Sequence, residues 1–373
     1  MEPFKNFFSP GLVELTAAHV ARHCAGFDAQ GFVDQVVPAM EPLELKARAQ
    51  LIADTLHAAL PRSAAARAKT LHAVLHPDPL DHANKPSDDD GLCGWAVLPL
   101  TMLVGQYGVG DFDRSMGLLR DMTMRFSSEF GIRDFLLADQ EKALTILGTW
   151  LNDPNRHVRR LISEGTRPRL PWAMQLPALM TDPTPVLPLL ERLRDDPELY
   201  VRRSVANHMN DISKDHPTRI SSLAADWIKD ADKDRMALLR HACRSLIKQG
   251  DAATLAVFGH NPPLLAPAEV SLSADRIQMG GAVDITMPLQ STASVPQLLT
   301  IDYVVHFLKA NGRRVPKVFK GTTLTLAPHT TGLFRRSHAF RHVTTRKHYP
   351  GRHAVSLRIN GQDTKPAEFI LDL

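Results

Sequence analysis

Asp153-Pro-Asn-Arg-His-Val-Arg-Arg160 returns 43 residues later as Asp196-Pro-Glu-Leu-Tyr-Val-Arg-Arg203. The Asp, the Pro, the Val and both Arg residues are shared. A period of roughly 40 residues is typical of helix-pair repeats of the HEAT or armadillo kind. We interpret the Asp as a helix cap and the Pro as the first helical residue. A looser third copy spans Asp234 to Arg244. The repeat predicts a helical solenoid with a concave surface for a long partner.

The sequence on both sides of the repeat extends the helical pattern over residues 1–259. In the segment Leu45–Leu60, apolar residues recur at the spacing of one helical face. Three further segments have a similar pattern: Leu118–Phe126, Glu141–Leu151 and Met236–Ile247. We therefore predict an all-α HEAT-like domain over residues 1–259.

Beyond Ala268 the apolar period changes to two. The segment from Leu299 to Phe307 alternates between apolar and mostly polar positions, and Val355–Ile359 and Phe369–Leu373 repeat the pattern. Asn-Gly pairs at 311–312 and 360–361 are typical of hairpin turns. The pattern predicts an all-β immunoglobulin-like sandwich over residues 268–373, joined by a proline-rich linker at 260–267.

The net charge is divided unequally between these two parts. The whole chain carries 44 basic and 40 acidic residues, a net charge of +4. Residues 260–373 hold 14 basic and 7 acidic residues, a net +7, which leaves 30 against 33, a net −3, for the rest. A basic terminal domain favours an anionic partner.

Several other classes of protein are not expected. Cys24, Cys93 and Cys243 lie too far apart for a disulfide framework, which favours a cytoplasmic protein. The apolar run at 95–104 is too short to span a membrane. No nucleotide-binding, serine-hydrolase or zinc-protease motif is present, so no cofactor is expected.

Metal binding has only weak signals. His72 and His76 are four residues apart, as are His19 and His23, but neither pair has an apparent third ligand. The loop Ser87-Asp-Asp-Asp-Gly91 resembles a Ca²⁺ loop only superficially, because the remaining ligand positions are missing. We therefore expect no metal site and interpret these residues as structural or solvated.

Three acidic residues are candidates for chemistry. Glu164 lies one turn after Arg160. Its equivalent in the next repeat is Asn207, and Asp211 lies one turn further on, so both acids can face one groove. Glu129 lies in the segment that precedes this helix pair. The alternative is that the acids only form ion pairs. Glu164 would pair with Arg160 within one helix, which is worth about 0.2–0.5 kcal/mol, and Glu129 would pair with Arg125 or Arg133.

Several segments resemble the AlkC branch of the bacterial alkylation-repair DNA glycosylases, which are built on HEAT-like repeats. They are Glu2-Pro-Phe-Lys-Asn, Phe112-Asp-Arg-Ser-Met116, Met122-Thr-Met-Arg-Phe-Ser-Ser-Glu-Phe130, Trp150 to Arg160, and Ser163 to Trp172. Family members commonly continue Phe-Ala-Ile-Arg-Pro, whereas this chain has Phe130-Gly-Ile-Arg-Asp134. The C-terminal part resembles the immunoglobulin-like domain that some members carry.

The resemblance implies a monomeric bacterial enzyme acting on alkylated double-stranded DNA. It implies that Glu129 and Glu164 are catalytic carboxylates, that Trp172 faces the lesion and that Asp211 is a further active-site acid. The implied reaction is hydrolysis of cationic N3-methylated bases without base flipping.

DNA binding also needs cations for the phosphates. Our candidates are Arg159, Arg160, Arg202, Arg203, Arg240, Arg244, Lys248, Arg335, Arg336, Arg341, Arg346, Lys347 and Arg352. The spacing of Arg240, Arg244 and Lys248 predicts one basic helix face, and the tail residues are interleaved with aromatics. An ordinary solvated surface is the alternative for these residues. For the whole chain, the alternative is a non-catalytic HEAT-repeat DNA-binding or scaffold protein.

Overall fold

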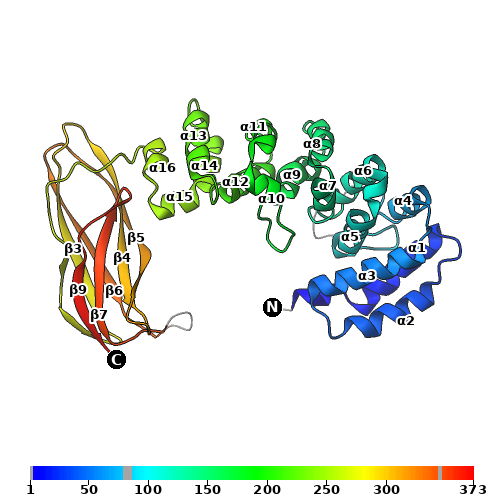
Figure 1. Ribbon diagram of the computed structural model, residues 1–373, viewed down its shortest axis with the longest axis horizontal. Helices are drawn as coiled ribbons and strands as arrows, with labels where there is room; N and C mark the ends of the chain where they lie inside the picture. Colours follow the sequence, from blue (N-terminus) through cyan, green and yellow to red (C-terminus); the bar gives the residue numbers. More distant parts are fainter. Residues whose placement is uncertain (1–2, 79–85, 343–346) are drawn as a thin grey trace. The chain divides into compact units, whose positions relative to one another are not determined.

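A computed structural model describes residues 3–78, 86–342 and 347–373 (Figure 1). A helical region is followed by an immunoglobulin-like β domain, as the periodicity predicts. The chain divides into two compact units. The first comprises residues 1–215 and 233–242, and the second comprises residues 216–232 and 243–373.

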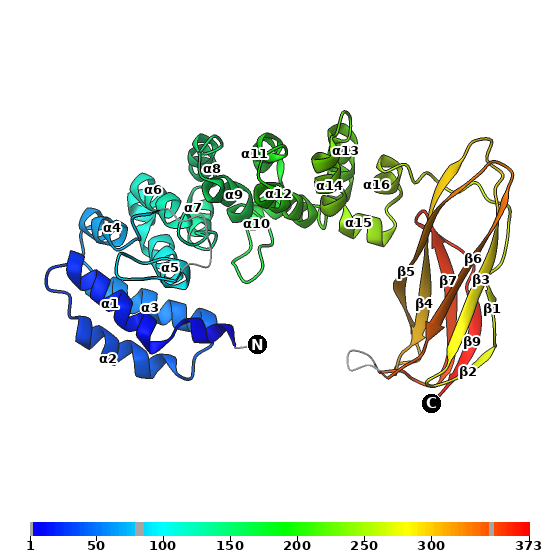
Figure 2. The ribbon, with the colours of Figure 1, turned by 180° about the vertical axis from the view of Figure 1, so that it is seen from behind.

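The first unit is built from helices that follow one another in chain order (Figures 1 and 2). They are α1 Pro10–His23, α2 Ala29–Met40, α3 Leu45–Ala59, α4 Ala64–Ala73, α5 Val97–Gly108, α6 Phe112–Thr123, α7 Ile132–Ala138, α8 Gln140–Thr149, α9 Arg156–Gly165, α10 Pro177–Thr181, α11 Leu187–Leu193, α12 Leu199–Ile212 and α14 Lys233–Ala242. Short 3₁₀ helices are η1 Phe4–Phe7, η2 Gly94–Ala96, η3 Val109–Asp111 and η4 Thr184–Val186. The predicted helix from Leu45 buries Ala49, Ile52 and Leu56, as its spacing indicates.

The repeated Asp-Pro pair does not cap the helix, contrary to the sequence interpretation. Helix α9 begins at Arg156, and its N-cap is Asn155, whose side chain accepts from His157 N at 2.8 Å. Asp153 instead accepts from the backbone N of Asn155 at 2.8 Å. The Asp-Pro pair therefore forms a turn ahead of the helix, because a side chain that accepts two residues onward shapes a turn.

The repeated Asp residues join successive repeats through ion pairs. Arg120 Nε donates to Asp153 at 2.8 Å, and Arg159 Nε donates to Asp196 at 2.6 Å. In the looser third copy, Arg202 Nη2 donates to Asp234 at 2.8 Å. Each Asp thus receives an Arg from the preceding repeat, which explains why the motif recurs with the period of the solenoid.

The predicted helix over 236–247 is interrupted. Helix α14 ends at Ala242, and α15 Arg244–Gln249 begins after Cys243, whose ψ of 3° departs from helical geometry. The i, i+4, i+8 argument for one basic face of Arg240, Arg244 and Lys248 is therefore wrong. All three side chains are exposed.

The second unit combines a sandwich with helices α13 Pro217–Trp227, α15 and α16 Ala252–Val257. Its strands are β1 Ser271–Leu272, β2 Arg276–Gln278, β3 Ala282–Gln290, β4 Gln297–Leu308, β5 Arg314–Leu326, β6 Thr331–Ala339, β7 Gly351–Ile359, β8 Gln362–Asp363 and β9 Ala367–Asp372. One sheet has the order β1-β3-β6, and the other has β2-β9-β7-β4-β5 with β8 beside β7.

The alternating residues of the sandwich form its core, as predicted. Leu299, Ile301 and Val305 on β4 are fully buried, as are Val355 and Leu357 on β7. The register pairs Ile301 with Ile359 and Val305 with Val355, so same-face apolar residues meet across strands. Both Asn-Gly pairs lie in the turns of hairpins, β4–β5 and β7–β8.

The proline-rich segment 260–267 is bound along the sandwich. Ala266 N donates to Gln290 O at 2.9 Å, and Asn360 Nδ2 donates to Asn261 O at 2.7 Å. The segment is thus an ordered part of the second unit. Among the described residues, no helix is long and apolar enough to cross a membrane.

Candidate active site

A cavity of about 300 Å³ in the first unit is lined by three of the four predicted catalytic residues, Glu129, Glu164 and Trp172. It is lined by Leu45, Lys46, Trp95, Leu98, Phe126, Ser127, Glu129, Phe130, Glu164, Arg167, Leu170, Pro171 and Trp172. An aromatic wall borders it, because the ring of Trp95 stacks on Phe7 at 4.8 Å and lies 5.1 Å from Phe126. The lining thus combines an apolar wall with two carboxylates.

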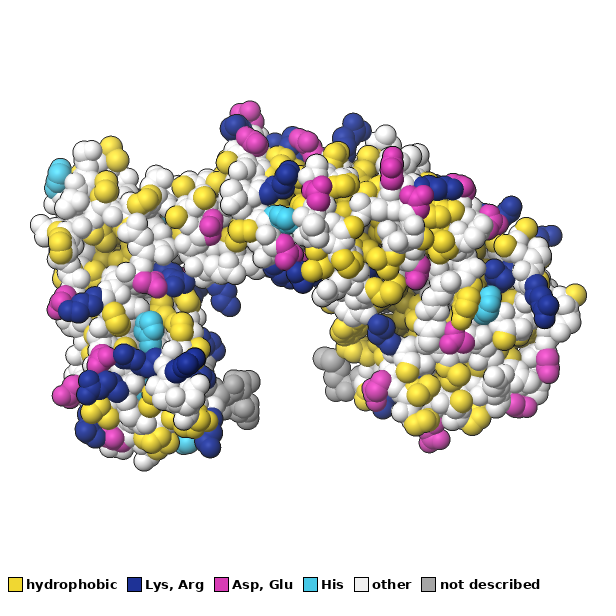
Figure 3. Space-filling model, in the orientation of Figure 1, with side chains coloured by type: hydrophobic (Ala, Val, Ile, Leu, Met, Phe, Trp, Pro, Cys, Tyr) yellow, Lys and Arg dark blue, Asp and Glu magenta, His cyan; other side chains and the backbone are white. Residues whose placement is uncertain are grey.

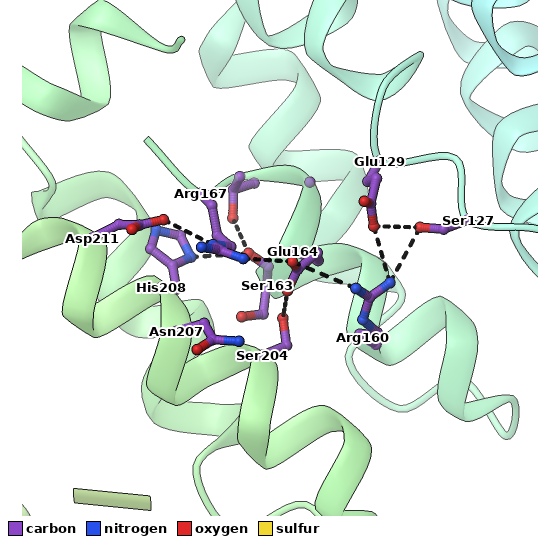
Figure 4. A network of polar contacts seen from close by, with 12 residues as sticks. Ser127, Glu129, Arg160, Ser163, Glu164, Arg167, Ser204, Asn207, His208 and Asp211 are labelled. Carbon is purple, nitrogen blue, oxygen red and sulfur yellow. Dashed lines mark hydrogen bonds and ion pairs between the residues drawn. The ribbon is translucent and has the colours of Figure 1, made fainter. Parts of the chain in front are cut away.

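Glu129 lies in the loop between α6 and α7 and is partly exposed. Its Oε2 accepts from Ser127 Oγ at 2.7 Å and from Arg160 Nη1 at 3.0 Å (Figure 4). Within the described residues, its Oε1 makes no hydrogen bond. One carboxylate oxygen is therefore oriented by the protein, and the other remains available to a ligand or water.

The glycine after Phe130 allows this loop to lie close to α5. A Cβ at Gly131 would lie 2.2 Å from Thr101 O, a backbone atom that cannot move aside. The alanine that family members commonly carry here would therefore displace the loop from α5. Asp134, the second departure from the family pattern, is partly buried, and burial raises its pKa to about 6.

Glu164 lies on α9 and is 5% exposed. Its Oε1 accepts from Arg167 Nη1 at 2.6 Å and lies 3.4 Å from Arg160 Nη2, while Oε2 accepts from Ser204 on α12 at 2.6 Å. Both oxygens are engaged, so this carboxylate has a fixed orientation.

Asp211 lies on α12, behind Glu164. Arg167 Nε donates to Asp211 Oδ2 at 2.8 Å, and Lys214 Nζ donates to Oδ1 at 2.9 Å. Asp211 is not among the residues that line the cavity. Figure 4 shows the result, a row in which carboxylates and guanidinium groups alternate from Glu129 to Asp211.

The alternation of charge keeps the buried acid ionised. Burial alone would raise the pKa of Glu164, but the charges of Arg160 and Arg167 outweigh it and hold that pKa below its ordinary value. His208 lies behind the row. Its burial disfavours the protonated imidazole and lowers its pKa to about 4. His208 Nδ1 lies 3.0 Å from Ser163 O. Within the described residues, His208 Nε2 has no hydrogen-bond partner.

Trp172 is presented by a strained loop. Its φ of 64° lies in the left-handed region, which is costly for a bulky residue, and its side chain is 63% exposed. Lys46 Nζ donates to its carbonyl oxygen at 2.6 Å. The fully buried Arg133 donates to the carbonyls of Gly165, Arg167 and Met174, at 3.0, 2.9 and 2.7 Å. These contacts hold a large aromatic ring at the cavity mouth.

The two arginines of the repeat motif have different environments. Arg159 and Arg202 form the ion pairs between repeats. At both positions the structure therefore favours a role in joining repeats over the predicted contact with DNA. Arg160 belongs to the row of charges and lies 4.8 Å from the ring of Tyr200. Arg203 is exposed, and it has no ion pair among the described residues.

The predicted basic residues of the tail are exposed where they are described. Arg335 contacts Asp284 at 3.2 Å, Arg352 contacts Glu368 at 3.1 Å, and Arg336 donates to Gly321 O at 2.7 Å. Arg341 and Lys347 are exposed too, whereas Arg346 lies outside the described residues. Figure 3 shows Lys and Arg side chains crowding the lower part of the sandwich on one face.

Sequence reasoning missed Arg167, Ser204, Lys46 and Trp95, and it assigned Glu129 to the wrong arginines. The sequence held an indication that Arg167 belongs to the site, because it lies three residues after Glu164. It held no such indication for Lys46 and Trp95, since they come from distant parts of the chain. Trp150, which flanks the same sequence region, is buried away from the cavity lining.

Comparison with known proteins identifies relatives over the whole length. Residues 266–373 match a family model described as the C-terminal Ig-like domain of the uncharacterised protein YhaZ. The uncharacterised protein YhaZ of Bacillus subtilis is 35% identical over 99% of both chains. The alkylpurine DNA glycosylase AlkC of Pseudomonas fluorescens, solved bound to DNA containing an abasic-site analogue, is 35% identical over 100% of both chains, with a TM-score of 0.79. The chain therefore belongs to the family of the alkylpurine DNA glycosylase AlkC and of YhaZ, with a C-terminal Ig-like domain.

Proposed function

We propose that this protein is a monofunctional DNA glycosylase that hydrolyses the N-glycosidic bond of cationic N3-methylated bases in duplex DNA, without base flipping. Its substrate is 3-methyladenine, with 3-methylcytosine as a second substrate to be tested. The observation that carries the proposal is the cavity where Glu129, Glu164 and Trp172 meet, in a chain similar to AlkC over its full length.

Departure of a cationic base requires little catalysis by the protein. When the C1′–N bond breaks, both electrons go to a base that is already cationic, so the base leaves neutral and needs no strong general acid. The deoxyribose becomes oxocarbenium-like, and fixed negative charge can stabilise it. The ionised, doubly held carboxylate of Glu164 suits that role.

Glu129 suits the role of positioning the water that attacks the sugar. Its Oε1 makes no hydrogen bond within the described residues, while Oε2 is held by Ser127 and Arg160. A water bound at Oε1 can attack C1′ and transfer its proton to the carboxylate, which is general-base catalysis. Arg160 joins the two acids and keeps them from repelling one another.

Trp172 suits contact with the cationic sugar. An aromatic face attracts a nearby cation by about 0.5–2 kcal/mol. The ring is exposed at the mouth of the cavity, and Arg133 and Lys46 hold its loop in place. The enzyme would thus contact the lesion from the sugar side and need no closed base pocket.

The exposed cations of the sandwich would hold the DNA backbone. Each phosphate contact contributes about −0.9 to the slope of log K against log salt concentration. Replacing both Arg341 and Lys347 by Gln should therefore reduce the slope by up to about 2. Arg276→Gln, which alters a cation paired with Asp372, is the control. An unchanged slope in the double variant would remove these two residues from the DNA-binding surface.

A non-catalytic DNA-binding or scaffold protein remains the second candidate, because Glu129, Glu164 and Asp211 all form ion pairs. A base-release assay separates the two functions. Wild type should free 3-methyladenine from methylated duplex DNA, and Glu164→Gln should abolish release while leaving DNA binding largely intact. Neutral lesions should not be released, because they need protonation of the base. Binding without release by wild type, across a panel of alkylated DNAs, would establish the scaffold reading.

A further inference from the structure

We propose that His76, Asp88 and Asp90 form a binding site for a divalent transition-metal ion of the Zn²⁺ class. One ligand atom from each of the three residues lies within 4.8 Å of the others. None of them lines the catalytic cavity. Neither the histidine spacing nor the acidic loop indicated a site alone, and the fold brings the two together.

The distance between two of the ligand atoms fits a shared ion. His76 Nε2 lies 3.4 Å from Asp88 Oδ1, which is longer than the usual 2.7–3.2 Å of an N–H···O hydrogen bond. Two ligands of a tetrahedral Zn²⁺ ion, each bound at about 2.0–2.1 Å, are separated by about 3.4 Å. Asp90 is exposed, so its side chain is free to turn toward the ion.

The imidazole of His76 is buried and oriented by the backbone of Asp78. His76 is 5% exposed, Asp78 N donates to its Nδ1 at 3.2 Å, and the carbonyl oxygen of Asp78 lies 3.3 Å from the same nitrogen. Metal binding through Nε2 requires the proton on Nδ1, which would then donate to this carbonyl in place of accepting from Asp78 N. In that tautomer a backbone carbonyl is a common partner of a metal-bound histidine.

The backbone places the acidic turn before any ion binds. Leu92 N donates to Val74 O at 2.8 Å, and His76 N donates to Leu92 O at 3.0 Å. At Gly91 a Cβ would lie 2.3 Å from His76 Cα, so only glycine permits this close approach. The turn is also closed internally, because Asp90 N donates to Asp88 Oδ1 at 3.0 Å.

The ligand set selects among metals and indicates a structural role. One imidazole and two carboxylates suit Zn²⁺, Co²⁺ or Mn²⁺, whereas Ca²⁺ and Mg²⁺ prefer oxygen ligands alone. The acidic turn leads directly to Trp95 in the wall of the cavity, and Arg125 Nε donates to His76 O at 2.8 Å. An ion here would therefore stabilise that wall from behind.

The test titrates the chelator-treated full-length protein with Zn²⁺ and follows heat, melting temperature and, with Co²⁺, visible absorption. Wild type should bind one ion at its tightest site and melt at a higher temperature. Asp90→Asn should weaken that binding by at least about tenfold, since even loss of an outer-shell partner costs 10–100-fold. Asp89→Asn is the matched control, because it removes the same charge from the neighbouring residue and should leave affinity within about twofold.

Three outcomes would overturn the proposal: no Zn²⁺ binding by wild type, equal weakening by Asp89→Asn and Asp90→Asn, or Ca²⁺ binding as tightly as Zn²⁺. Equal weakening would mean that the turn attracts cations through its charge alone. Every readout is binding or stability, so the result does not depend on glycosylase activity.

Discussion

Arg167 donates to Glu164 at 2.6 Å, and the same guanidinium donates to Asp211 at 2.8 Å. One buried cation thus fixes two acids from neighbouring repeat helices. The two acids lie on either side of this guanidinium because α9 packs on α12, and Arg167, two residues after the end of α9, reaches between them.

We expect Arg167→Met to destabilise the helical unit by about 3–5 kcal/mol, because it leaves two buried carboxylates short of a partner. Arg169→Met is the matched control two residues away. Arg169 pairs with Asp215 near the surface, and such exposed pairs add little to stability. Urea unfolding followed by circular dichroism measures both, and equal effects would contradict the role given to Arg167.

Glu129→Gln should slow single-turnover release of 3-methyladenine by about 10²–10⁴-fold, the usual loss when a general base is removed. Gln keeps the size of the side chain and can still accept from Ser127, so folding should be preserved. Glu191→Gln, on α11 and 58% exposed, controls for the loss of one negative charge. A rate close to that of wild type would assign the water to another group.

Trp172→Gly should have opposite effects on stability and on activity. Glycine removes a left-handed strain of about 1–2 kcal/mol, so the variant should be at least as stable as wild type. It also removes the ring, so base release should slow. Trp172→Phe keeps an aromatic face and should retain more activity. If the glycine variant is as active as wild type, the ring does not contact the reacting sugar.

Replacing Arg202 by alanine should affect stability, whereas replacing its neighbour Arg203 should affect DNA binding. Arg202 is buried and bonded to Asp234, so Arg202→Ala should lower stability. Arg203 is exposed, so Arg203→Ala should leave stability unchanged and reduce the salt slope of DNA binding by about 0.9. Melting curves and binding isotherms at several salt concentrations test this division. The reverse result would place Arg202 on the DNA.

Stability should fall as the pH drops from about 6.5 toward 4, with His208 as one cause. Its folded pKa of about 4 lies below the ordinary 6.5, so in this window the unfolded chain binds a proton that the folded chain does not. The loss from this group is at most about 3 kcal/mol, and the lowered pKa of Glu164 adds to it below pH 4.5. His208→Asn should flatten the curve between pH 4 and 6.5 when unfolding is measured across pH. An unchanged slope would assign the effect to other groups.

The sequence predicted the repeat, the change of period near residue 268 and the burial of Leu299, Ile301 and Val305. These features depend on local periodicity, which one face of a helix or strand imposes on the chain. Helix ends were less predictable. Asn155 caps α9 in place of Asp153, and Cys243 interrupts a helix whose apolar spacing continues through it.

The sequence by itself determined the fold class and, through its resemblance to a known family, the acids and the tryptophan of the candidate site. Only the tertiary structure decided what those residues contact. Arg160 bridges Glu129 and Glu164, Lys46 holds the carbonyl of Trp172, and His76 meets Asp88 and Asp90. Such contacts join segments that are far apart in the chain. Which residues meet depends on how the helices pack, and no local sequence pattern predicts this.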